Sequence, residues 1–159
     1  MPTGLVVLLV AIVAAAAFGV YRKRTDGRLN VVAATPVPSE SAPVAPDHGL
    51  HLRHHVKPES LSSDQIGAEL GEQATLVQFS SAFCQPCRAT RQVLEQITDM
   101  VPGVTHVEID AESHLDLVRA LDIRRTPTVF VLRSDGTIAR RAAGVPRKAD
   151  VIAAIGELV

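Results

Sequence analysis

Apolar and polar residues divide the chain into three stretches with different patterns. Residues 5–20 are almost continuously apolar, whereas residues 29–57 carry several prolines and no apolar periodicity. From residue 61 onward, apolar residues recur at the spacings typical of strands and helices. These patterns predict a membrane anchor over residues 4–21, a basic flank and Pro/His-rich linker over residues 22–60, and a folded domain over residues 61–159.

The folded part carries strand and helix patterns in alternation. Strand patterns cover residues 75–80, 104–110, 128–132 and 137–142, and the Asp135-Gly136 pair predicts a hairpin turn between the last two. Helical patterns cover residues 62–70, with a stop at Gly71, and the segment after Cys87. A third helical segment opens with a capping box from Ser113 to Asp116. A last helix opens at Pro146 and carries an apolar stripe at Val151, Ile152, Ile155, Leu158 and Val159. The order β-α-β-α-β-β-α predicts an α/β fold with a central mixed sheet and helices on both faces.

The N-terminal apolar stretch predicts a single transmembrane helix. With Gly4 it reaches 17 residues, the short end of what spans a bilayer, and the basic cluster Arg22-Lys23-Arg24 follows it. A cleaved signal peptide is the main alternative, but signal peptides carry their positive charge before the apolar run; a buried core helix is a further alternative. Because Lys and Arg stay on the cytoplasmic side, we expect the C-terminal domain to face the cytoplasm, with an extracytoplasmic domain as the alternative.

The linker contains four of the six histidines within residues 48–55. A solvated linker explains them, and a transient copper, nickel or zinc site is the alternative, since no closed ligand set is present in this stretch. The net charge of −1 and the absence of basic residues interleaved with aromatics give no indication of nucleic-acid binding.

The two cysteines of the chain, Cys84 and Cys87, stand between a predicted strand and a predicted helix. A thiol at a helix N-terminus faces unpaired backbone N–H groups and the positive end of the helix dipole, and both stabilise the thiolate. Arg88 and Arg91 add positive charge nearby. The spacing predicts a reactive Cys84, with Cys87 one helical turn inward and close enough to form a disulfide with it.

Together these residues resemble the thioredoxin family, over about residues 74–159. The resemblance rests on Phe83-Cys84-Gln85-Pro86-Cys87, Val107-Glu108-Ile109-Asp110, Thr126-Pro127-Thr128, Asp135-Gly136 and Gly144, and it is closest to small membrane-tethered thioredoxin-like proteins of bacteria. It implies a thioredoxin fold with Cys84 as the attacking cysteine and Cys87 as the resolving cysteine. It also implies a substrate groove at Phe83, Pro86, Thr126, Pro127 and Gly144.

Two of these groove residues have other interpretations. The resemblance implies a cis bond before Pro127, which would place the Thr126 backbone where it could hydrogen-bond an extended substrate. An ordinary trans loop proline is the alternative. Gly144 could equally be a simple strand terminator.

The chain also departs from the family pattern. Phe83 stands where thioredoxins usually carry Trp, and Gln78 stands where they carry a buried Asp that is thought to help deprotonate the resolving cysteine. Gln cannot exchange a proton in the working pH range. His106 stands where the family often has Lys, and we hypothesise that His106 takes over proton transfer; the alternative is a sheet-face residue without that role.

The function that follows is thiol–disulfide exchange, without metal or organic cofactor. Because Gln85-Pro86 resembles the dipeptide of reducing members, we expect a reductase, with a potential nearer to the thioredoxin value of about −270 mV than to the oxidase value of about −120 mV. The expected partners are a protein disulfide or thiol substrate, and thioredoxin reductase or a membrane thiol carrier as electron donor; we expect a monomer. Two alternatives are a copper- or zinc-handling tether that uses the cysteines and linker histidines, and a redox-silent interaction module.

Overall fold

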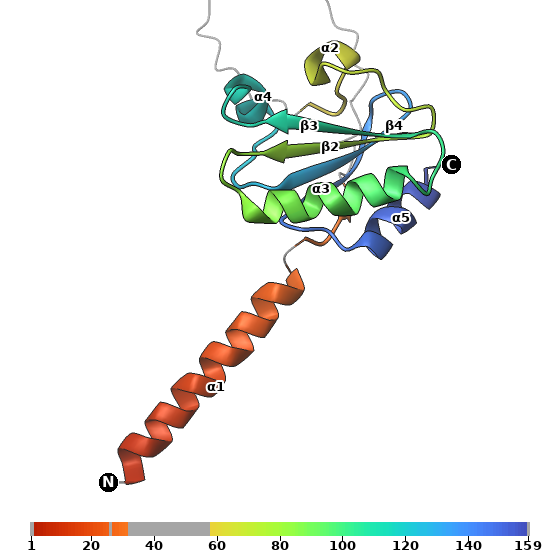
Figure 1. The fold of residues 1–159 in the computed structure, drawn as a ribbon. Helices are drawn as coiled ribbons and strands as arrows, with labels where there is room; N and C mark the ends of the chain where they lie inside the picture. The colour runs from red at the N-terminus through yellow and green to blue at the C-terminus, as the bar shows by residue number, and fades with distance from the viewer. Residues whose placement is uncertain (1, 26, 32–57, 159) are drawn as a thin grey trace, which may run out of the picture.

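The computed structural model describes residues 2–25, 27–31 and 58–158. Helix α1 (Pro2–Thr25) forms where the sequence predicts a helix, and it extends away from the remainder of the structure (Figure 1). The large apolar residues of this helix that are exposed, between Val6 and Val20, have exposed fractions of 53% to 68%. Among the described residues, no helix combines the length and apolar character that crossing a membrane requires. The anchor over residues 4–21 therefore stays a prediction.

The domain is built on a five-stranded mixed sheet with the strand order β1-β5-β4-β2-β3. The strands are β1 (Asn30–Val31), β2 (Ala74–Ser80), β3 (Val104–Asp110), β4 (Thr128–Arg133) and β5 (Ile138–Ala143). β2 and β3 are parallel, and every other pair of neighbours is antiparallel. The predicted mixed sheet is therefore confirmed, including the hairpin that joins β4 to β5.

Helices cover both faces of this sheet (Figure 1). On one face, α3 (Gln85–Thr98) and α5 (Lys148–Gly156) pack with Leu76 and Val131 of the sheet. On the other face, the short helices α2 (Ser63–Ile66) and α4 (Leu115–Ala120) lie over a core in which Phe79 and Phe130 meet edge to face at 5.8 Å. Because β2 lies between β3 and β4 and is buried along its whole length, the loop that follows it emerges at a fixed place at the end of the sheet.

The structure adds an element that the sequence does not predict. Asn30 and Val31 pair with Arg141 and Arg140 of β5, so a segment expected to be linker forms an edge strand. Glu59 also belongs to the sheet margin, because its carbonyl accepts a 2.8 Å hydrogen bond from the Ile138 N–H. Pairing between segments about 110 residues apart leaves no local signal in a proline-rich stretch.

Three helix predictions need correction. α2 ends at Gly67 in the left-handed conformation (φ 68°), not at Gly71, because Gly67 itself terminates the turn. The capping box predicted at Ser113 is absent from the described contacts: His114 takes the N-cap position, and the Ser113 hydroxyl donates to Asp110. In α5, Ile152 is 37% exposed, and the buried positions are Val151, Ala154 and Ile155.

Candidate active site

The two cysteines lie at the junction of strand β2 and helix α3. Cys84 takes the N-cap position, and its Sγ accepts a hydrogen bond from the Cys87 N–H at 3.1 Å. The two residues form a disulfide, as predicted from their spacing. Cys84 is half-buried, whereas Cys87 is only 3% exposed. One sulfur therefore faces solvent and the other is held inside.

Pro86 belongs to the first turn of α3, where backbone N–H groups have no partner inside the helix. A proline costs nothing there, since it has no N–H to leave unpaired. Phe83, which directly precedes Cys84 in the sequence, is 98% exposed. An exposed aromatic ring beside a half-buried sulfur creates an apolar rim around Cys84. The role of Phe83 and Pro86 in substrate binding stays a prediction.

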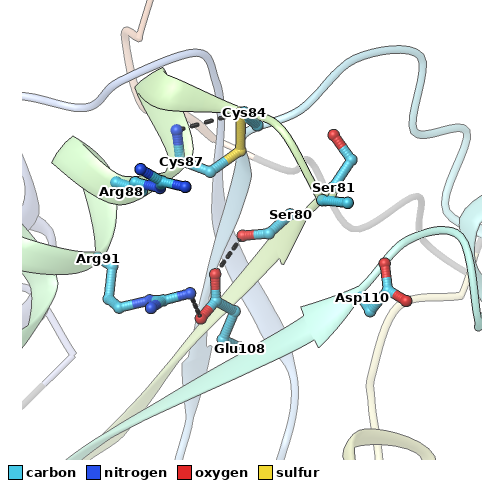
Figure 2. A pocket seen from close by; sticks show the side chains of 9 residues that line it. Ser80, Ser81, Cys84, Cys87, Arg88, Arg91, Glu108 and Asp110 are labelled. Atoms are coloured by element: carbon cyan, nitrogen blue, oxygen red, sulfur yellow. Dashed lines mark hydrogen bonds and ion pairs between the residues drawn. A yellow bond between two sulfur atoms is a disulfide. The ribbon is translucent and has the colours of Figure 1, made fainter.

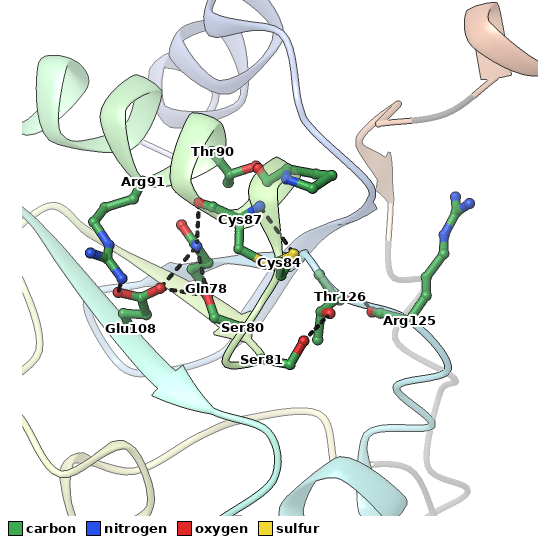
Figure 3. The surroundings of a disulfide bond; sticks show 12 residues. Gln78, Ser80, Ser81, Cys84, Cys87, Thr90, Arg91, Glu108, Arg125 and Thr126 are labelled. Carbon is green, nitrogen blue, oxygen red and sulfur yellow. Dashed lines mark hydrogen bonds and ion pairs between the residues drawn. A yellow bond between two sulfur atoms is a disulfide. The ribbon is translucent and has the colours of Figure 1, made fainter.

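The loop before β4 lies against the loop that carries the cysteines. The hydroxyls of Thr126 and Ser81 are 2.9 Å apart, and the Cys84 N–H donates to the Ser81 carbonyl at 3.3 Å (Figure 3). The Thr126–Pro127 bond is cis, as the resemblance implied. The Gly144 N–H donates to the Pro127 carbonyl at 2.7 Å, which brings the predicted groove residues into one neighbourhood.

The Gln78 side chain links strand β2 to the first turn of α3 by a hydrogen bond. It is fully buried, and its Nε2 lies 2.8 Å from Ser80 Oγ, 3.0 Å from the Cys87 carbonyl and 3.3 Å from Glu108 Oε1 (Figure 3). All three can act as acceptors, which fixes the orientation of the amide. Within the described part of the chain, Oε1 of Gln78 has no hydrogen-bond partner.

Glu108 on β3 is a site residue that the sequence analysis does not predict. Its Oε1 accepts from the Ser80 hydroxyl, and its Oε2 forms an ion pair with Arg91 of α3 (Figure 2). Burial alone would raise the pKa of Glu108, but the hydrogen bonds from Arg91 and Ser80 outweigh it and lower that pKa below its ordinary value. The sheet register places Glu108 opposite Gln78. The sequence alone does not reveal this register, so it does not indicate that Glu108 belongs to the site.

His106 stands two register pairs away from Glu108, opposite Leu76. Burial lowers its pKa, against the opposite effects of the carboxylates of Glu108 and Glu95. Its Nε2 is buried without a hydrogen-bond partner among the described residues. Gln78 and the Ser80 hydroxyl donate hydrogen bonds to Glu108, so the structure places a carboxylate where the hypothesis places this imidazole. The proton-transfer role of His106 stays a prediction.

An open pocket lies beside the disulfide (Figure 2). It is lined by Ser80, Ser81, Ala82, Cys84, Cys87, Arg88, Arg91, Glu108 and Asp110. Among the described residues, no group of three or more His, Cys, Asp or Glu side chains is placed to hold a metal ion. The histidines of residues 48–55 lie outside the described residues.

A profile of the thioredoxin family matches residues 58–157, and the chain belongs to the thioredoxin family. It is a thioredoxin-like thiol–disulfide oxidoreductase, with Cys84 and Cys87 as its redox pair.

Similar proteins agree with this assignment. The chain is 29% identical to thioredoxin C-2 of Corynebacterium nephridii over 56% of this chain and 81% of the relative. It is 30% identical to thioredoxin-2 of Dictyostelium discoideum over 49% and 89%, and 32% identical to thioredoxin H4-1 of Oryza sativa subsp. japonica over 50% and 63%. Chloroplastic thioredoxin z superposes with a TM-score of 0.52 at 26% identity, over 65% of this chain and 95% of that chain.

Proposed function

We propose that this protein reduces disulfide bonds of protein substrates while its N-terminal helix holds it at a membrane. The observation that carries the reductase proposal is the asymmetric pair at the start of α3, a half-buried Cys84 and a buried Cys87. The exposed sulfur is suited to meet a substrate disulfide first. The buried sulfur is suited to a second, intramolecular step.

The reaction has two exchange steps. The Cys84 thiolate attacks a substrate disulfide, forms a mixed disulfide and releases one substrate thiol. The sulfur of Cys87 then attacks Cys84, releases the second substrate thiol and re-forms the disulfide of this structure. The hydrogen bond from the Cys87 N–H to Cys84 Sγ and the helix N-terminus both favour the Cys84 thiolate over the thiol.

The groove residues bind the substrate segment in this proposal. We assign the exposed Phe83 and Pro86 to one wall of the groove and Thr126, Pro127 and Gly144 to the other, since the Thr126 hydroxyl contacts Ser81 and the Gly144 N–H donates to the Pro127 carbonyl. A substrate cysteine in an extended segment would lie between them, with its flanking backbone along the Thr126 loop. The reducing direction is supported by the Gln85-Pro86 dipeptide, and an electron donor, thioredoxin reductase or a membrane thiol carrier, would regenerate the dithiol.

Membrane attachment is supported by helix α1. Its apolar side chains are exposed in the structure, and the basic cluster Arg22-Lys23-Arg24 follows the apolar run in the sequence. Positive residues on this side favour a cytoplasmic domain. The proposed place of action is therefore the cytoplasmic surface of a membrane, with the extracytoplasmic surface as the alternative.

Reduction of insulin disulfides tests the activity. We expect the full chain to catalyse it and Cys84→Ser to abolish it, whereas Cys87→Ser should accumulate a mixed disulfide that is visible on a non-reducing gel. Catalysis that persists in Cys84→Ser would contradict the assignment. A chain inactive with every disulfide substrate would favour the redox-silent interaction module.

A labelling experiment tests the side of the membrane. Ser60 is exposed at the margin of the domain, so a Ser60→Cys substitution in a Cys84→Ser, Cys87→Ser background offers a single reporter thiol. We expect a membrane-impermeant maleimide to label it only after the cells are lysed. Labelling in intact cells would place the domain outside, and recovery of the chain in the soluble fraction would contradict the anchor.

A further inference from the structure

The second exchange step requires Cys87 to lose a proton, and the structure limits where that proton can go. Cys87 is 3% exposed, so its thiol is largely shielded from solvent in the folded domain. Gln78, the side chain that contacts the Cys87 backbone, has no titratable proton. The proton must therefore leave by way of the pocket that opens beside the disulfide.

The charged and titratable groups around this pocket come from two elements. Helix α3 contributes Arg88 and Arg91, which are cations, with Glu95 further along the helix. Strand β3 contributes Glu108 and Asp110 to the lining, and His106, two residues before Glu108 on the same strand, interacts electrostatically with its carboxylate. The candidate proton acceptors in the pocket lining are thus the carboxylates of Glu108 and Asp110.

The two carboxylates differ in what they face. Asp110 is exposed, and its oxygens accept hydrogen bonds from the Ser113 hydroxyl and the Glu112 N–H, away from the cysteines. Glu108 accepts instead from the Ser80 hydroxyl, and Ser80 also lines the pocket next to Cys87. In Figure 2, Ser80 stands between Glu108 and the disulfide.

We propose that Glu108 is a positioning residue for the resolving step and that its carboxylate receives the Cys87 proton through the Ser80 hydroxyl. This inference rests on the proposed two-step exchange. In the step, the Cys87 S–H bond breaks and its proton passes by way of pocket water and the Ser80 hydroxyl to Glu108. The Cys87 sulfur forms the bond to Cys84, and the Cys84–substrate bond breaks. The substrate sulfur leaves with that electron pair and takes up a proton from solvent, and Glu108 returns its proton to solvent.

Arg91 controls how well Glu108 can perform this role. It forms an ion pair with Oε2, which leaves Oε1 directed at Ser80 and Gln78. The same ion pair keeps the carboxylate a weak base, because it favours the charged form. Loss of Arg91 should therefore strengthen Glu108 as an acceptor, whereas loss of Glu108 or of the Ser80 hydroxyl should interrupt the proton path.

Single-turnover kinetics separate the two exchange steps. The reduced protein is mixed with an excess of a peptide disulfide, and formation and decay of the mixed disulfide are followed by acid quench between about pH 3 and pH 9, a range that includes the titration of Glu108. We expect Glu108→Gln to leave mixed-disulfide formation unchanged and to slow its decay about tenfold near neutral pH, a modest share of what proton transfer usually contributes. Ser80→Ala should slow the same step. Glu112→Gln removes an exposed carboxylate outside the pocket and should match the wild type.

Arg91→Gln distinguishes proton transfer from a purely structural role. If Glu108 receives the proton, the mixed disulfide should decay as fast as in the wild type or faster. The acid limb of the pH profile of this decay should shift to higher pH, because the carboxylate loses the cation that favours its charged form. If the ion pair only holds the helix in place, Arg91→Gln should slow decay as Glu108→Gln does, and the inference would be wrong.

Two further outcomes would overturn the inference. One is a Glu108→Gln variant with unchanged decay and an unchanged pH profile in an otherwise active protein. The other is a His106→Ala variant that alone shifts the acid limb. Failure of the proposed function looks different, because the wild type itself would then form no mixed disulfide at Cys84.

Discussion

The side-chain Nε2 of Gln78 lies 3.0 Å from the backbone carbonyl oxygen of Cys87 and donates a hydrogen bond to it. This bond joins the interior strand β2 to the first turn of α3, which carries the buried cysteine of the redox pair. The same nitrogen also contacts the Ser80 hydroxyl at 2.8 Å. A single buried amide therefore fixes the position of the resolving cysteine.

Replacing this amide should destabilise the domain. In Gln78→Leu the Cys87 carbonyl and the Ser80 hydroxyl lose a buried donor, and we expect the free energy of unfolding to fall by about 1–3 kcal/mol. Urea denaturation of the oxidised protein measures the change. Gln92→Leu, at an exposed position of α3, is the matched control and should stay within about 0.5 kcal/mol of the wild type. Equal stability of the two variants would contradict the prediction.

The Glu108–Arg91 ion pair should make stability depend on pH at the acid end. Because the pKa of folded Glu108 is lowered by Arg91 and Ser80 against the effect of burial, the carboxylate stabilises the fold above its unfolded pKa of about 4.5. This contribution should disappear as the pH falls through the lower pKa of the folded state. Arg91 is 48% exposed, so solvent screening limits the pair to about 0.5–1 kcal/mol.

Denaturation of wild type and Glu108→Gln at about pH 7 and pH 2.5 measures this contribution. We expect the wild type to be the more stable of the two at neutral pH and the difference to shrink at acid pH. A difference that stays constant across this range would show that the ionised carboxylate does not stabilise the fold.

His106 should be neutral at pH 7, because burial lowers its pKa below the ordinary value. On unfolding the imidazole regains its ordinary pKa of about 6.5 and takes up a proton, so the fold should lose stability as the pH falls below that value. His106→Gln removes this dependence and should lose less stability than the wild type between about pH 7 and pH 5. The NMR titration of the His106 ring protons gives an independent check. A midpoint above 6.5 would contradict the prediction.

Phe83 should contribute to substrate binding without contributing to the fold. Its side chain is 98% exposed, so Phe83→Ala should leave the unfolding midpoint unchanged. Removing the ring should cost about 1 kcal/mol of apolar contact with the substrate. This loss predicts an approximately fivefold higher KM for insulin, with kcat little changed. A small soluble disulfide that cannot cover the ring is the control substrate, and its KM should not change. An equal loss with both substrates would indicate damage to the redox pair itself.

The sequence by itself determined what depends on neighbours along the chain. Strand 104–110 was predicted to the residue, because its alternation is local. The placement of Cys84 at a helix start with Cys87 one turn inward, and the Asp135-Gly136 hairpin, follow from equally local geometry. These features were enough to predict the fold and the redox pair.

Tertiary structure decided which groups surround that pair. Glu108 is 30 residues from Gln78 in sequence, and only the parallel register of β2 and β3 brings their side chains together. Arg91 reaches the same carboxylate from α3. The sequence pointed to His106, because it stands where the thioredoxin family often has Lys, but the register sets it opposite Leu76. Two positions along a strand separate side chains by almost 7 Å, and no local pattern encodes which of them lies opposite Gln78.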